Sequence, residues 1–297
     1  MNEIPLDLAE TLAAAVDEGT FEAAARRLHI TPSAVSQRIK ALEGRLGRVL
    51  LVRSKPIRPT EAGAAVLRFA RQAATLAHDT LTELGMDDGD AVRARVPLAV
   101  NADSLATWFV EPLARLSEQH PVVFDLHRDD QGFTAELLES GTVIGAVTSQ
   151  TRAVGGCRVS PLGAMRYEAV ATPGFAARWF GDGVDAHALG RAPVVDFDRR
   201  DELQNDWLRA YGSVTVSPPR HYVPASQDFA AAVLAGMGWA MLPSFQSASG
   251  LASGALIRLG GRPLDVPLHW QQWNLSSPLL DAIASEIVDT GRRVLRR

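Results

Sequence analysis

The sequence has few features that would suit a secreted or membrane protein. Its one cysteine, Cys157, cannot form an internal disulfide bond and is typical of a reducing compartment. No apolar run approaches the roughly 20 residues that span a bilayer. The opening residues, MNEIPLDLAE, lack the basic and apolar regions of a signal peptide. We therefore expect a cytoplasmic protein with no membrane partner.

The short motifs of common enzymes and metal sites are also missing. The seven histidines are scattered without an HExxH pair, there is no cysteine cluster for zinc, and no GxSxG turn is present. GMGWAML has neither the spacing nor the context of a dinucleotide-binding loop. Cys157, in a Gly-Gly-Cys-Arg segment, is interpreted as an incidental thiol. We expect no catalytic residue, no metal ligand and no cofactor.

Basic residues are slightly fewer than acidic ones overall (30 against 34) but are concentrated near the N-terminus. Residues 20–60 contain nine basic and two acidic residues, a net charge of +7 in a chain whose total is −4, so the remainder carries −11. A basic head on an acidic body is typical of a nucleic-acid-binding protein. An ordinary solvated face is the alternative, and the motif inside the segment has to decide.

Three short helical patterns open the chain. Residues 6–16 and 21–28 are predicted to form the first two helices. Thr31 followed by Pro32 is a favourable helix start, with a capping hydroxyl before proline at the first helical position. Because only two residues separate the second and third helices, the spacing predicts a helix-turn-helix.

The third predicted helix is amphipathic. Val35, Ile39 and Leu42 share one face at about 100° per residue, and the opposite face is polar. A recognition helix presents polar groups near its N-terminus to base edges and cations to phosphates. The polar residues are Ser33, Gln37 and Lys40, with Ser36 and Arg38 on the flanks. By this pattern alone, an ordinary amphipathic surface helix remains an alternative.

A basic hairpin is predicted directly after this helix. VLLVRSK has the pattern of a strand, and prolines at 56 and 59 stiffen the following turn. Arg53, Lys55 and Arg58 lie along it. Such a wing can reach phosphates or a minor groove. The alternative is a basic hairpin with no ligand.

TPSAVSQRIKALEGRLG followed by LLVRSKPIRPTEAG resembles the N-terminal signature of LysR-type transcriptional regulators. In that family the first motif contains the helix that enters the major groove, and the Pro-Thr of the second starts a linker helix. The resemblance implies double-stranded promoter DNA as a partner. The residues that match the recognition helix are Thr31, Ser33, Ser36, Gln37, Arg38 and Lys40, and those that match the wing are Arg53 and Arg58.

A long helix is predicted from Thr60 to about Leu84, with an apolar stripe at three- and four-residue spacing. Its length and its place between two domains favour packing against a copy of itself. Packing on its own domain is the alternative. We expect a homodimer through this helix and leave a tetramer open. Residues 85–90 are predicted to form a hinge.

Beyond the hinge, short β-branched runs alternate with amphipathic segments, which predicts an α/β body with a mostly parallel sheet. Ligands of open α/β sheets bind beyond the carboxyl ends of the strands, beside helix starts. Polar side chains at such ends could therefore hold a ligand, although Ser104 or Asp103 could also only cap a helix and exposed acids are usually just solvated. These residues are Ser104, Asp129, Asp130, Thr148, Asp196 and Asp198.

The body resembles the two-lobed, periplasmic-binding-protein-like effector domain of LysR-type regulators. LAVNADSLATW, GAVTSQ, APVVDFD and LASGALI are similar to the lysine- and arginine-responsive branch of that family, the LysG/ArgP type, which controls basic-amino-acid export. The resemblance implies an effector carboxylate near Ser104 and Thr148, with the acids toward its cationic end. YGSVTVSPPRHYV matches nothing in this pattern.

We therefore expect a multidomain protein that combines α+β and α/β folds. Its parts would be a winged helix-turn-helix (1–60), a linker helix and hinge (61–88), effector lobe I (89–163 and 266–297) and effector lobe II (164–265). The expected function is a DNA-binding regulator that senses lysine or arginine and controls genes such as an exporter. The alternatives are a LysR-type regulator for a different small carboxylate, and a general nucleoid or replication-origin binder.

Overall fold

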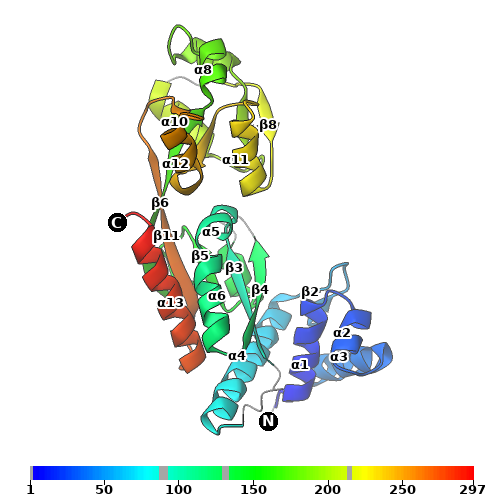
Figure 1. Ribbon diagram of the computed structural model, residues 1–297. Coiled ribbons are helices and arrows are strands. Elements are labelled where there is room, and N and C mark those ends of the chain that lie inside the picture. The colour runs from blue at the N-terminus through cyan, green and yellow to red at the C-terminus, as the bar shows by residue number, and fades with distance from the viewer. Residues whose placement is uncertain (1–2, 87–92, 129–133, 213–215) are drawn as a thin grey trace. The chain divides into compact units, whose positions relative to one another are not determined.

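The computed structural model describes residues 3–86, 93–128, 134–212 and 216–297 (Figure 1). Two compact units divide the chain. The first contains Met1–Val100, Pro112–Ser160 and Trp270–Val288, and the second contains Asn101–Glu111, Pro161–His269 and Asp289–Arg297. Two long strands, β6 (Cys157–Ala171) and β11 (Leu264–Trp273), carry the chain from one unit to the other.

The first unit begins with three helices, α1 (Leu6–Asp17), α2 (Phe21–Arg27) and α3 (Pro32–Leu46). Their bounds lie within one residue of the sequence prediction because the predicted caps form. The Thr20 hydroxyl accepts a hydrogen bond from the Ala23 amide (3.1 Å), and the Thr31 hydroxyl accepts one from the Ala34 amide (3.2 Å). The apolar seam of α3, formed by Val35, Ile39 and Leu42, is buried in the core of these helices.

The wing is shorter than VLLVRSK suggests. It consists of β1 (Leu51–Val52) and β2 (Arg58–Pro59), which pair antiparallel over two residues each. Pro56 and Pro59 have no backbone N–H to extend the ladder. In the turn between the strands, the Ser54 hydroxyl donates to the Pro56 carbonyl at 2.6 Å. The prolines therefore convert most of the predicted strand into a turn.

Helix α4 (Glu61–Glu83) follows the wing directly and is the longest helix described. Thr60 anchors its start, since its hydroxyl accepts from the Gly63 amide (3.0 Å) and donates to the Val49 carbonyl (2.7 Å). Gly63 has no room for a side chain, because a Cβ there would lie 1.9 Å from the Leu50 carbonyl oxygen. The first half of α4 is buried against the N-terminal helices, and its second half exposes apolar side chains.

A parallel sheet forms the remainder of the first unit. Strand β3 (Ala94–Val100) lies between β4 (Val122–Arg128) and β5 (Gly145–Thr148) and runs parallel to both. The helices of this part of the chain are α6 (Val110–Gln119), α7 (Thr134–Glu139) and α13 (Pro278–Val294). Gly145 on β5 lets the Trp270 ring pack against the strand, since a Cβ would lie 2.5 Å from that ring.

The second unit contains antiparallel as well as parallel pairing. β6 pairs antiparallel with β9 (Ala240–Pro243) and with β10 (Ile257–Arg258), whereas β7 (Val194–Asp196) is parallel to β8 (Arg220–Tyr222). The parallel pairing expected from sequence therefore holds for β3 with β4 and β5 and for β7 with β8, whereas β6 pairs antiparallel with β9 and β10. The helices of this unit are α5 (Ala102–Thr107), α8 (Pro173–Trp179), α9 (Ala186–Arg191), α10 (Leu203–Gly212), α11 (Ser226–Leu234) and α12 (Ser244–Ser253).

Candidate nucleic-acid interface and effector residues

The polar face of α3 is open to solvent. Ser33, Gln37 and Lys40 are exposed, as is the capping residue Thr31, whose hydroxyl lies 2.9 Å from that of Ser33. Buried Val35, Ile39 and Leu42 fix the opposite face, so these polar groups point away from the core. Exposed hydrogen-bonding groups on the first turns of a helix-turn-helix suit base edges in a major groove.

Two of the predicted contact residues on α3 are only half-exposed. Ser36 lies on the flank of the helix, and Arg38 donates from Nη1 to the Thr11 hydroxyl of α1 at 3.3 Å. Arg38 therefore helps to hold α3 on α1, and its remaining N–H groups alone are left for a phosphate. Sequence periodicity placed it on the flank but could not show that Thr11 would be its partner.

The wing presents further cations. Arg53 and Arg58 are exposed, and the Arg53 guanidinium lies 6.0 Å from the centre of the Phe21 ring of α2. Arg45 and Arg48, which sequence reasoning counted only as charge, are exposed at the end of α3. In the described part of the chain, no ion pair within 4.0 Å occupies the exposed cations Lys40, Arg45, Arg48, Arg53 and Arg58. Their charge is available to a polyanion.

In the second unit, Ser104 lies on α5 and is fully buried. Its hydroxyl has no hydrogen-bond partner in the described residues, and neither do the two polar atoms of the neighbouring buried Asn101 amide. Buried polar groups are nearly always paired, and an unpaired one destabilises a fold by about 1–3 kcal/mol. These three atoms are therefore suited to a polar ligand.

Asp103, between Asn101 and Ser104, joins three segments of the second unit. Its carboxylate accepts hydrogen bonds from the Tyr167 hydroxyl of β6 and the Ser226 hydroxyl of α11, both at 2.7 Å. The Gln246 amide of α12 donates to the Ser226 hydroxyl at 3.0 Å. Sequence reasoning treated Asp103 only as a helix cap, because nothing in the sequence connects it with Tyr167 or Ser226.

The two described acids at the end of β7 have internal partners. Asp196 is buried and accepts from Arg220 of β8 at 2.5 Å, and burial raises the pKa of this carboxyl although Arg220 opposes the change. Asp198 accepts from the backbone amides of Arg200 (2.7 Å) and Asp201 (3.1 Å), which makes it a turn residue. Burial also raises the pKa of Asp201, to about 6.

The other predicted effector residues are placed as follows. Thr148 ends β5 in the first unit, is fully buried, and its hydroxyl accepts from the Gln150 amide at 3.1 Å. Asp129 and Asp130 lie outside the described residues. The described ranges contain no group of three or more His, Cys, Asp or Glu side chains placed to hold a metal ion. Within the same ranges, every helix is too short or too polar to cross a bilayer.

An exposed cationic helix-turn-helix with a wing, followed by a long helix and an α/β body, defines a DNA-binding protein with an appended domain. Comparison with known families identifies both parts. Residues 6–64 match the bacterial regulatory helix-turn-helix protein, lysR family, and residues 89–286 match the LysR substrate binding domain. The chain belongs to the LysR family of transcriptional regulators, which are not enzymes.

Relatives and solved structures agree with this assignment. The chain is 46% identical over 276 residues to the transcriptional regulator LysG of Mycobacterium tuberculosis, covering 93% of this chain and 90% of the relative. It is 39% identical over 298 residues to ArgP of Aeromonas salmonicida, covering 100% and 99%. The crystal structure of ArgP from Mycobacterium tuberculosis superposes with a TM-score of 0.84 at 44% identity, covering 97% and 98% of the two chains. Full-length LysG from Corynebacterium glutamicum with bound effector Arg gives 0.76 at 36% identity, covering 99% and 100%.

Proposed function

We propose that this regulator binds promoter DNA in the cytoplasm, senses lysine or arginine, and controls genes such as an amino-acid exporter. The observation that carries the effector assignment is the buried, unpartnered polar group formed by Asn101 and Ser104. It lies in a chain similar to a LysG that holds arginine, and to a relative from Corynebacterium efficiens named as a lysine export regulatory protein (42% identity). Titration with each of the two amino acids distinguishes a lysine sensor from an arginine sensor.

For the effector, we propose Ser104 and Thr148 as contacts of the α-carboxylate, because a buried hydroxyl can donate to it. The cationic end would face an acid, for which Asp129, Asp130 and Asp198 are the candidates. Asp196 is already paired with Arg220, so we assign it the role of holding β7 and β8 together beside the effector. A desolvated ammonium or guanidinium needs such a carboxylate.

For DNA, we propose that Ser33, Ser36 and Gln37 contact base edges, that Thr31 positions them, and that Arg38, Lys40, Arg53 and Arg58 contact phosphates. We further propose that α4 pairs with α4 of a second copy. Phe69, Leu76, Leu81 and Leu84 are 37%, 42%, 45% and 65% exposed, and this apolar surface favours burial in a dimer. The same proposal includes the domain limits, which are a DNA-binding domain at 1–60, a linker helix and hinge at 61–88, lobe I at 89–163 with 266–297, and lobe II at 164–265.

The direct test is calorimetric titration of the full-length protein with arginine, lysine, leucine and glutamate. We expect saturable binding of arginine or lysine, and weaker binding in Ser104→Ala because an effector hydrogen bond is lost. Ser253→Ala is the matched control, since Ser253 is an exposed serine of the same unit. Binding of leucine or glutamate without either basic amino acid would overturn the effector assignment and favour a different small carboxylate.

A footprint separates a regulator from a general DNA coater. We expect protection of one promoter site beside the regulated genes, and a change of that footprint when the effector is added. Uniform protection of unrelated DNA, unaffected by any amino acid, would instead favour a nucleoid or replication-origin binder.

A further inference from the structure

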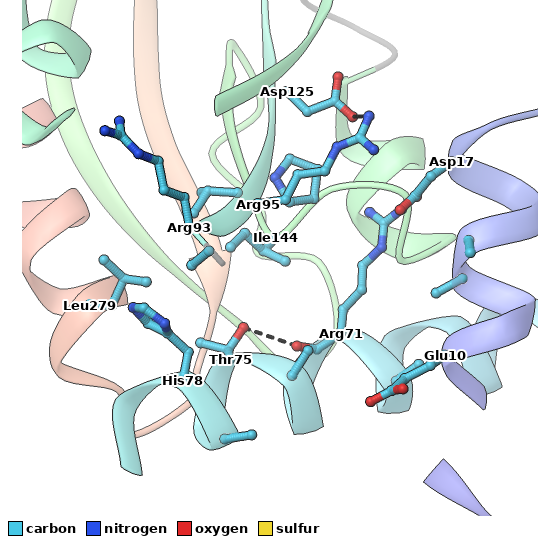
Figure 2. Close-up of a pocket in the computed structure, with 18 of the residues that line it drawn as sticks. Glu10, Asp17, Arg71, Thr75, His78, Arg93, Arg95, Asp125, Ile144 and Leu279 are labelled. Atoms are coloured by element: carbon cyan, nitrogen blue, oxygen red, sulfur yellow. Dashed lines mark hydrogen bonds and ion pairs between the residues drawn. The ribbon is translucent and has the colours of Figure 1, made fainter. Parts of the chain in front are cut away.

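The first unit contains a cavity of about 410 Å³ between α1, α4 and β3 (Figure 2). This volume lies in the range of small-molecule sites, about 300–1,000 Å³. Much of its wall is apolar and is formed by Ala14, Ala70, Ala74, Leu81, Ile144 and Leu279. None of its lining residues belongs to the proposed effector set.

One buried cation in this cavity lacks a full set of partners. Arg71, on α4, is 9% exposed and reaches toward Asp17 of α1, to which its Nη2 donates (Figure 2). Its Nη1 is buried and has no hydrogen-bond partner in the described part of the chain. Burial lowers the pKa of Arg71, and Asp17 opposes the change. A buried donor without an acceptor is rare and marks a place where a ligand oxygen would be stabilising.

The charges around the cavity are largely compensated by ion pairs. Four arginines line it, Arg27, Arg71, Arg93 and Arg95, against three carboxylates, Glu10, Asp17 and Asp125. Two of the carboxylates are already paired. Asp17 pairs with Arg71 and with Arg27 (2.8 Å), and Asp125 pairs with Arg95 (2.8 Å). Glu18, just outside the lining, pairs with Arg95 (3.1 Å) and Arg27 (3.6 Å), so the charges near the cavity balance. The unpaired Nη1–H of Arg71 is therefore the feature that attracts a carboxylate oxygen, whereas a dicarboxylate also meets the acids of the wall.

We propose that this cavity is a second ligand site, which binds a small organic monocarboxylate with an apolar body. One carboxylate oxygen accepts the Nη1–H of Arg71, and the hydrocarbon part packs on the alanines of α1 and α4 and on Leu279. The site is independent of the proposed basic-amino-acid effector, whose cationic side chain suits neither the Arg71 guanidinium nor the apolar wall.

The test is calorimetric titration of the full-length protein with isocaproate, a branched aliphatic monocarboxylate, with and without saturating arginine. We expect one saturable site per chain under both conditions. Isocaproamide, which has the same shape without the charge, should bind at least tenfold more weakly, since a charged acceptor makes the stronger hydrogen bond. Because the arginine-free arm stands alone, failure of the effector proposal would not obscure the result.

Three variants locate the site. Ala74→Phe places a ring in the cavity and should abolish isocaproate binding, whereas Ala65→Phe, on an exposed position of α4 outside the cavity, should not change it. Arg71→Lys keeps a cation opposite Asp17 but removes the second planar N–H, and should weaken binding at least tenfold. The proposal is overturned by the absence of saturable binding, by equal affinity for acid and amide, or by unchanged binding in Ala74→Phe.

Discussion

In the N-terminal helices, the side chains proposed to contact DNA come from residues 31–58, and Thr31, Ser33, Gln37, Lys40, Arg53 and Arg58 are exposed. In the second unit, the polar groups around Asn101, Ser104 and Asp196 are buried and come from separate segments. Under the proposed functions, the two regions recognise their ligands in different ways. Long-range charge on an open surface suits a polyanion, whereas desolvated hydrogen bonds suit a small molecule.

The salt concentration should affect DNA binding by the N-terminal region far more than effector binding by the second unit. Exposed cations release counterions from DNA, so the DNA affinity of the protein should fall by roughly a thousandfold or more between about 50 and 200 mM salt. The proposed effector contacts are buried, so effector affinity should change only severalfold over the same range. Fluorescence anisotropy with promoter DNA and calorimetry with arginine measure the two dependences. A DNA affinity that did not change with salt would remove the electrostatic basis of the comparison.

The junction between wing and linker offers a mutation that should damage one region alone. Gly63→Ala places a Cβ 1.9 Å from the Leu50 carbonyl oxygen, and we expect a loss of about 3 kcal/mol in unfolding free energy, because backbone must move. DNA binding should fail while arginine binding remains. Gly44→Ala is the matched control, since a Cβ there meets nothing within 4 Å and alanine favours helix by about 1 kcal/mol. Urea unfolding and both binding assays test this, and equal behaviour of the two variants would contradict it.

Within the DNA-binding surface, different side chains should determine the preference for a DNA sequence and the overall affinity for DNA. Gln37→Ala should reduce discrimination between the preferred site and a mutated one by about 1–3 kcal/mol, because an exposed amide on the groove-facing side is lost. Arg53→Ala should weaken binding to both sequences alike and lower the salt slope by about one. Competition binding with the two DNA sequences measures this. If Gln37→Ala left the preference unchanged, the groove-facing side of α3 would have to be reassigned.

A pH dependence is expected in the second unit alone. Burial raises the pKa of Asp201 to about 6 from 3.8 and also raises that of Asp196, so the folded state binds protons more tightly than the unfolded chain. The contribution of Asp201 to the stability of this unit should therefore be fully present below about pH 4 and be lost as pH rises toward about 6, by at most about 1.4 kcal/mol per pH unit.

Urea unfolding followed by tryptophan fluorescence is a suitable measurement, since Trp207 and Trp239 are buried with ring centres 5.0 Å apart in this unit. Asp201→Asn should flatten the dependence between pH 4 and 6. Stability that rose with pH over this interval in the parent chain, and not in the variant, would show that Asp201 is stabilised as the carboxylate.

The N-terminal helices could be predicted from sequence because their signals are local. Thr20, Thr31 and Pro32 mark helix starts, and each acts within four residues of its own position. The wing was predicted too long because the strand pattern was given more weight than Pro56 and Pro59, which interrupt the backbone hydrogen bonds.

The sequence by itself therefore determined the family, the helix-turn-helix and the basic surface, since charge, caps and periodicity are written in adjacent residues. Only the tertiary structure decided which polar side chains have partners. Asp196 pairs with Arg220, Asp103 with Tyr167 and Ser226, and Arg71 with Asp17, each across a long stretch of chain. The pairing of buried charges and hydroxyls depends on which segments the fold brings within about 3 Å, and no local pattern encodes that distance.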